Sequence, residues 1–177
     1  MIKPICRLGN PILRKICKEL TKQEVLSDEF TQLKQDLKDS MKHYGGIGIA
    51  APQIGVELNV ALIELGPINR YGAEISLPAT YFINPKIKVL SDSTEGNWEG
   101  CLSVPGLRGY VERPNHIEVT YFDEEFIERK LEVKGFLAVV IQHELDHLFG
   151  KLYIDHIKDM SLLSFQEEFE AFVLSQK

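Results

Sequence analysis

The segment between Gly135 and Gly150 constrains the fold of this chain more than any other part of it. Its first six residues, Phe-Leu-Ala-Val-Val-Ile, are apolar on every face of a helix, which is typical of a helix that is buried on all sides. Gly150 suits the left-handed cap at which many helices end. The sequence therefore predicts a central buried helix around which the rest of the chain must pack.

Near its end, this helix carries the run His143-Glu144-Leu145-Asp146-His147. Two histidines four positions apart lie on one face of a helix, so both imidazoles can bind a single divalent metal. Charged side chains on a buried helix need a partner, and a metal supplies one. Glu144 adjoins the first histidine, where a carboxylate is placed to accept a proton from a water that the metal activates. The motif predicts a metal-dependent hydrolase and leaves its substrate open.

A catalytic metal of this kind usually has three protein ligands, so a third must lie elsewhere. One pattern, His-Glu-x-x-His-x-x-Gly-x-x-His, fails because Tyr153 stands where its last histidine would be. Glu167 has the spacing of the third ligand in thermolysin-like enzymes. However, Met160–Leu174 reads as an amphipathic helix on which Glu167 points away from the apolar stripe, and we expect it to be solvated. The inward residues of that stripe are Leu162, Phe165, Phe169, Phe172 and Val173.

Three further residues are candidates for the third ligand: Cys101, His116 and His156. Cys101 lies in the glycine-rich stretch 95–109, and a glycine before a ligand lets the backbone approach a site closely. One thiolate with two imidazoles is a recognised open catalytic set, although a free buried cysteine is also common. His116 begins a strand-like alternation and is expected on a strand surface, whereas His156 is expected to be exposed in a loop. The residues by themselves leave this choice open.

Three segments of the chain resemble the signature motifs of the peptide deformylases, in the same order. They are Gly46-Ile-Gly-Ile-Ala-Ala-Pro-Gln53, Glu99-Gly-Cys-Leu-Ser103 and Gln142-His-Glu-Leu-Asp-His147. The resemblance covers about Leu8 to Ile157, and no motif position departs from the pattern. It implies a metal-dependent hydrolase that removes the N-formyl group from the N-terminal formylmethionine of newly made polypeptides and releases formate. A thermolysin-like metalloendopeptidase that uses Glu167 is the alternative.

The resemblance also assigns roles to residues of this chain. The implied metal ligands are Cys101, His143 and His147. The implied catalytic residues are Glu144, which moves the proton, and Gln53 and Leu102, whose side-chain amide and backbone N–H would hold an oxyanion. The implied cofactor is one divalent ion, Fe²⁺ in the cell, while the ligand types also permit Zn²⁺, Ni²⁺ or Co²⁺.

Substrate binding is expected beside the metal. Val139 and Val140 precede His143 by four and three positions and share its helix face. With Ile47 they would form an apolar pocket for a methionine side chain, and Gly48 is grouped with them as a substrate-binding residue. Plain helix packing explains the two valines equally well. Later residues of the peptide would add as an extended strand through backbone hydrogen bonds.

The periodicity of the remaining sequence predicts an α+β fold, with antiparallel sheets packed around the central metal-bearing helix and a C-terminal helix. Its length and its 44% apolar content predict one domain over residues 1–177. The expected strands are Asn59–Leu65, Tyr81–Leu90, and a hairpin of His116–Phe122 with Phe126–Val133. A short helix is expected at Pro11–Ile16, and a longer one begins at Ser27 and stops at Gly45.

Charge and cysteine content exclude several classes of protein. The net charge is −6 and no basic run is present, which argues against a nucleic-acid-binding surface. No stretch approaches the roughly 20 apolar residues of a membrane span. The N-terminus lacks the features of a secretory or transit segment. The three cysteines (Cys6, Cys17 and Cys101) are spaced irregularly and predict no disulfide framework, so a reducing cytoplasm is expected. A transient contact of the tail helix with the ribosome is left open.

Overall fold

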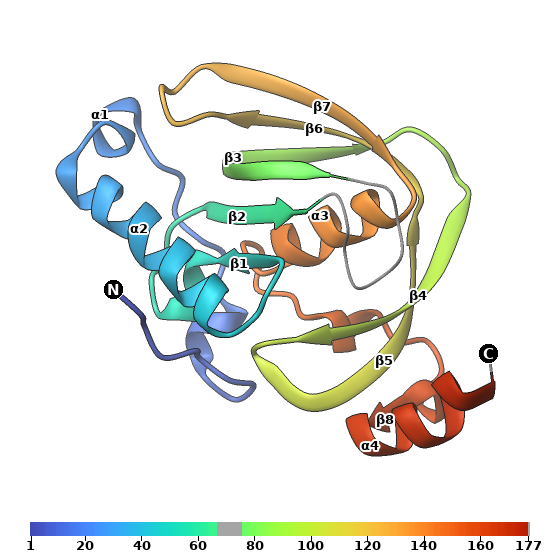
Figure 1. Cartoon of the computed structure of the whole chain (residues 1–177). Coiled ribbons are helices and arrows are strands. Elements are labelled where there is room, and N and C mark those ends of the chain that lie inside the picture. The colour runs from blue at the N-terminus through green and yellow to red at the C-terminus, as the bar shows by residue number, and fades with distance from the viewer. Residues whose placement is uncertain (67–75, 177) are drawn as a thin grey trace.

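The computed structural model describes residues 1–66 and 76–176 and contains two antiparallel sheets around one central helix (Figure 1). The larger sheet has the strand order β1-β2-β3-β6-β7, and the smaller sheet has the order β4-β5-β8. The central helix, α3, spans Phe136–Asp146. The α+β class expected from the sequence is therefore confirmed.

The strands of the larger sheet are β1 (Gly48–Ala50), β2 (Val60–Leu65), β3 (Leu77–Val89), β6 (His116–Phe122) and β7 (Glu128–Lys134). Those of the smaller sheet are β4 (Thr94–Cys101), β5 (Val104–Pro114) and β8 (Leu163–Phe165). The other α-helices are α1 (Lys22–Val25), α2 (Asp28–His43) and α4 (Gln166–Glu168). Short 3-10 turns occupy Pro11–Arg14, Ala51–Ile54, Tyr153–His156 and Met160–Leu162.

The larger sheet is buried on both faces, because α2 covers one and α3 covers the other (Figure 1). Successive side chains of a strand point to opposite faces. Along β2, Ala61 and Ile63 accordingly join the apolar cluster that contains α3. Val60 and Leu62 join the cluster that contains α2. This packing holds α3 firmly, with its C-terminal half directed toward the smaller sheet.

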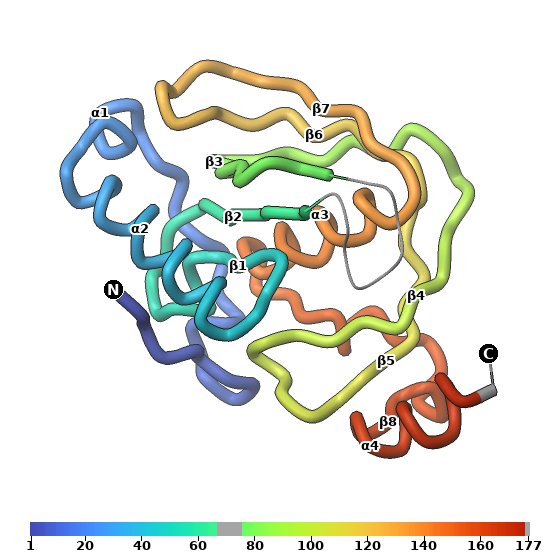
Figure 2. Tube along the Cα trace, viewed as in Figure 1, coloured from blue at the N-terminus to red at the C-terminus, as the bar shows by residue number. Residues whose placement is uncertain are grey.

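Backbone hydrogen bonds from the N-terminal segment, residues 1–10, connect the first two motifs. This segment runs beneath the turn at Ala51–Ile54 and reaches the β4–β5 hairpin (Figure 2). The N–H of Cys6 donates to the carbonyl of Gln53 at 2.7 Å, and the N–H of Leu8 donates to that of Ser103 at 2.8 Å. The two motifs therefore meet through a third stretch of chain.

Most elements expected from the sequence are present within a few residues of their predicted bounds. Ser27 caps α2 by accepting a hydrogen bond from the N–H of Phe30 at 3.2 Å. The buried helix ends at Asp146, earlier than expected, and Gly150 adopts the left-handed conformation (φ 71°) after a further turn. His147 follows α3 directly with helical dihedral angles (φ −58°, ψ −31°), so both histidines keep the helical spacing.

The prediction of a single amphipathic helix over Met160–Leu174 was wrong. A 3-10 turn comes first, and β8 then pairs with the outer edge of β5 before the chain becomes helical at Gln166. The free backbone groups of that edge offer hydrogen bonds that helical periodicity does not reveal. Phe169 is buried against Trp98, with ring centroids 4.9 Å apart. Phe165 and Phe172, expected to point inward, are each 67% exposed.

Within the described part of the chain, no helix combines the length and the apolar content that crossing a lipid bilayer requires. The segment from Gly66 to Pro78, about which the sequence was least informative, lies largely outside the described residues.

Candidate metal centre

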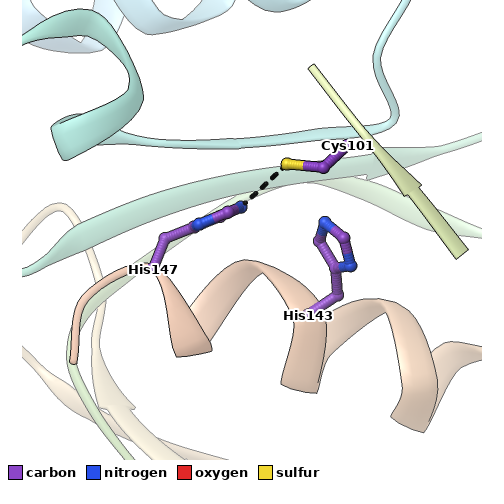
Figure 3. A group of neighbouring side chains, drawn as sticks. All are labelled: Cys101, His143 and His147. Atoms are coloured by element: carbon purple, nitrogen blue, oxygen red, sulfur yellow. Dashed lines mark hydrogen bonds between the residues drawn. The ribbon is translucent and has the colours of Figure 1, made fainter. Parts of the chain in front are cut away.

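The side chains of Cys101, His143 and His147 converge at the point where β4 ends beside α3 (Figure 3). Their ligand atoms all lie within 4.8 Å of one another. The Cys101 Sγ and the His147 Nε2 are 3.4 Å apart. Neither His116 nor His156 belongs to this group, so the structure favours the cysteine among the three candidates that the sequence left open.

This donor set fits a divalent metal ion. Metal–sulfur and metal–nitrogen bonds of about 2.3 and 2.1 Å in tetrahedral geometry would separate the two ligand atoms by roughly 3.6 Å, close to the observed 3.4 Å between Cys101 and His147. Burial disfavours the thiolate, but the imidazoles of His147 and His143 outweigh it and hold the pKa of Cys101 well below its usual value. A thiolate is the form that binds metal.

A buried carboxylate orients the first histidine. The Nδ1 of His143 lies 2.7 Å from the Oε2 of Glu99, which leaves the other ring nitrogen free to bind a metal. The guanidinium of Arg113 in turn donates two hydrogen bonds to Glu99, of 2.6 and 3.0 Å. Glu99 belongs to the middle motif, but its contact with His143 spans 44 residues and no local pattern predicts it.

The same arginine links the site to the C-terminal end of α3. Arg113 donates to Asp146 at 2.8 Å, and the Nε2 of His156 lies 2.8 Å from the same carboxylate. The expectation that His156 is exposed in a loop was therefore wrong, because its side chain reaches back to α3. His116 behaves as expected for a strand surface, since it pairs with Glu132 across the β6–β7 hairpin.

Glu144 lies beside the ligands in a nearly closed environment. It is 7% exposed, and burial raises the pKa of its carboxyl group. Its Oε2 is buried without a hydrogen-bond partner among the described residues. Gly48 makes room for it, because a Cβ at that position would lie 2.5 Å from the Glu144 Cγ. A carboxylate with a raised pKa and an open lone pair suits proton transfer near neutral pH.

Gln53 is held rigidly at the other side of the thiolate. Its Oε1 accepts the backbone N–H of Ala50 at 2.8 Å. Its Nε2 lies within hydrogen-bonding distance of the Ser103 Oγ (3.2 Å) and the Cys101 Sγ (3.5 Å). Leu102 and Ser103 form the tight turn between β4 and β5. The side-chain NH₂ of Gln53 therefore lies beside the ligand cluster, within reach of its thiolate.

One cavity of about 230 Å³ opens onto these groups. Its lining includes nearly all of the residues that the sequence analysis singled out: Ile47, Gly48, Gln53, Cys101, Leu102, Val139, Val140, His143 and Glu144. Asn97 and Phe136 also line it, and the sequence gave no reason to choose them. Glu167 lies apart from the ligand cluster, exposed on α4 as expected, so the endopeptidase alternative has no third ligand.

Comparison with known proteins agrees with this geometry. The model of the family described as polypeptide deformylase matches residues 2–162. The chain belongs to this family. A peptide deformylase of Leptospira biflexa is 41% identical over 170 residues, covering 96% of this chain and 95% of the relative. Peptide deformylase 1 of Prochlorococcus marinus is 43% identical, covering 99% of this chain and 91% of that protein. The resemblance seen in the three motifs is thus confirmed.

Solved deformylase structures have the same fold. The class I type b peptide deformylase of Acinetobacter baumannii bound to Met-Ala-Ser has a TM-score of 0.84 and 33% identity, over 89% of this chain and 99% of that one. The Synechococcus elongatus deformylase in complex with actinonin has a TM-score of 0.80 and 34% identity, over 96% and 85%. As a deformylase, this protein is a hydrolase, as the sequence predicted.

Proposed function

We propose that this deformylase removes the N-formyl group from the N-terminal formylmethionine of newly made polypeptides and releases formate. The observation that carries the proposal is the convergence of Cys101, His143 and His147 on one cavity in which the buried Glu144 has an unpartnered oxygen. This arrangement suits the hydrolysis of a small amide group.

In this proposal, the three converging side chains hold one divalent ion. When bound, such an ion lowers the pKa of water toward neutrality and stabilises negative charge on a carbonyl oxygen. We propose Fe²⁺ in the cell. A donor set of one thiolate and two imidazoles also accommodates Zn²⁺, Ni²⁺ and Co²⁺.

Glu144 carries the proton through the reaction. Its free oxygen accepts a proton from the attacking water as that water adds to the formyl carbon. The side-chain amide of Gln53 and the backbone N–H of Leu102 donate hydrogen bonds to the oxygen on which negative charge develops. Glu144 then gives the proton to the amine as the C–N bond breaks. Water and the formamide are thereby converted to formate and a free N-terminus.

The methionine side chain occupies the apolar part of the cavity, against Ile47, Val139 and Val140. β1 and β4 are edge strands of their sheets, and both contribute residues to the cavity wall. The peptide that follows the methionine can therefore add to a sheet edge through backbone hydrogen bonds.

Formate release from a formyl-Met peptide tests this function, with the acetyl-Met peptide as the matched control. We expect rapid hydrolysis of the formyl amide only, because the acetyl methyl group would crowd the ligand cluster. Hydrolysis of internal peptide bonds in a protein, without release of formate from the peptide, would contradict the proposal.

The ligand assignment is tested by metal content. Cys101→Ala should lose the bound ion, whereas Glu167→Ala should keep it. Glu144→Ala should lose most activity and retain the ion. An ion lost only on the change at Glu167 would restore the endopeptidase alternative.

We also propose that residues 1–177 form one domain that works in the cytoplasm, where reducing conditions protect the Cys101 sulfur from oxidation. A transient contact with the ribosome through the C-terminal segment belongs to the same proposal. Co-sedimentation of the protein with purified ribosomes, at low and at physiological salt, measures it.

A further inference from the structure

One face of β4 is turned toward α3 and contributes to the wall of the cavity. At one end of this face, the Oε2 of Glu95 lies 3.7 Å from the position that a Cβ on Gly135 would occupy. At the other end, Glu99 contacts the Nδ1 of His143 at 2.7 Å. Alternate residues of a strand share a face. Asn97 therefore shares this face of β4, and it lines the cavity together with Val139 and Val140.

Asn97 contributes an amide group to the wall of the cavity. The apolar residues of the same lining include Ile47, Phe136 and Val140. Among the described residues, the one hydrogen bond recorded for the Asn97 side chain is from its Nδ2 to the Glu95 Oε1, at the long distance of 3.5 Å. The Asn97 side chain is part-buried, and this long hydrogen bond leaves its amide N–H groups able to donate to a ligand in the cavity.

We infer that Asn97 is a specificity-determining residue whose Nδ2 donates a hydrogen bond to the sulfur of the substrate's methionine. This inference rests on the proposed function, which places that side chain in this cavity. The thioether sulfur is a weak acceptor and is the one polar atom of a methionine side chain. Norleucine has the same shape with a methylene in place of the sulfur, so Asn97 would distinguish the two.

The same amide would let the cavity accept oxidised methionine. Methionine sulfoxide carries a polar oxygen that disrupts purely apolar sites. Its oxygen is a stronger acceptor than the thioether sulfur, so the Asn97 amide would satisfy it. The inference therefore predicts that N-formylmethionine sulfoxide peptides are also hydrolysed.

Competition among three peptides tests the inference, using the metal-loaded full chain. The peptides differ only in the first residue: formyl-Met, formyl-norleucine and formyl-methionine sulfoxide. We expect the wild-type kcat/KM to favour methionine over norleucine by about two- to fivefold, the range of a weak hydrogen bond. In Asn97→Leu, which keeps the branching of the side chain, that ratio should fall to about one. Sulfoxide hydrolysis relative to methionine should fall about tenfold.

One further variant of Asn97 and one control variant complete the experiment. Asn97→Asp keeps the size but has no N–H donor, so it should lose the methionine preference even if the leucine variant folds poorly. Asn10→Leu places the same substitution at an exposed position outside the cavity and should leave every ratio unchanged. Unchanged ratios in both Asn97 variants would overturn the inference and leave the deformylase proposal standing. Failure of the wild type to hydrolyse formyl-Met peptide would overturn the proposed function itself.

Discussion

Gly48→Ala should inactivate the enzyme while leaving its metal site intact. The added Cβ would lie 2.5 Å from the Cγ of Glu144, and 2.6 Å from its Cδ and from its Oε1. Carbon atoms that are not bonded to each other normally stay about 3.5–4.0 Å apart. The Glu144 side chain must therefore move by about 1 Å, and it has little room because it is 7% exposed.

A displacement of this size at a reacting group costs about 10²-fold in rate, and we expect kcat for formate release to fall by that factor. The three atoms nearest to the new methyl group all belong to Glu144. Bound metal, measured by elemental analysis of the purified variant, should consequently stay near one ion per chain. Loss of activity with the ion retained would place the damage at the carboxylate.

Gly9→Ala is a useful control, because a Cβ there would meet no atom within 4 Å. Its φ of +100° makes the substitution cost stability, about 1–2 kcal/mol, but activity should remain at the wild-type level. A Gly48→Ala enzyme with bound metal and wild-type kcat would refute the reasoning, since Glu144 would then tolerate a displacement of about 1 Å.

Four further outcomes are expected. Arg113→Met removes the cation from the buried carboxylate of Glu99 and the part-buried carboxylate of Asp146 and should lower the free energy of unfolding in urea by about 3–5 kcal/mol. Burial raises the pKa of Asp123, but hydrogen bonds from backbone N–H groups and from a guanidinium outweigh burial, so the pKa of the folded protein lies below 3.8. The ionised Asp123 should therefore make the wild type more stable than Asp123→Asn above pH 3.8. This difference in the free energy of unfolding should disappear as the pH falls through the lower pKa of the folded state. Burial raises the pKa of Cys17 to about 11, so iodoacetamide at pH 8 should leave it unlabelled in peptide maps of the folded protein. Chelation of the metal should abolish formate release and lower the Tm in calorimetry, because an ion that binds only the folded chain stabilises it.

Local periodicity was enough to place one half of the candidate metal centre. The helical repeat predicted His143 and His147 on one face with Glu144 beside them; α3 carries His143 and Glu144, and His147 follows it directly with helical dihedral angles. The residues alone could not select Cys101 over the other candidates, because the contact between β4 and α3 depends on the packing of segments more than 40 positions apart. Resemblance to a family supplied what periodicity could not.

The sequence did not predict strands β4 and β5, because glycines interrupt the alternation of apolar and polar residues along them. These glycines serve close packing across the pair. A Cβ at Gly96 would lie 2.0 Å from the Tyr110 hydroxyl, and one at Gly100 would lie 2.2 Å from the Arg108 Nη1. The sequence shows that glycines stand at these positions, but it does not show that Tyr110 and Arg108 pack against them. The ion pair of Glu99 with Arg113 could not be predicted either, since it joins two neighbouring strands whose pairing the sequence did not predict.

The clamp formed by Glu99 and Arg113 has a consequence for the choice of ion. The imidazole of His143 is oriented by Glu99 before any metal ion binds. Glu99 is itself fixed by two hydrogen bonds from Arg113, which is 3% exposed. A divalent ion that binds here would therefore find one of its three donors already oriented and would have to order only the other two. One thiolate and two imidazoles accommodate several divalent ions, so the availability of each metal in the cell would contribute to which ion is bound.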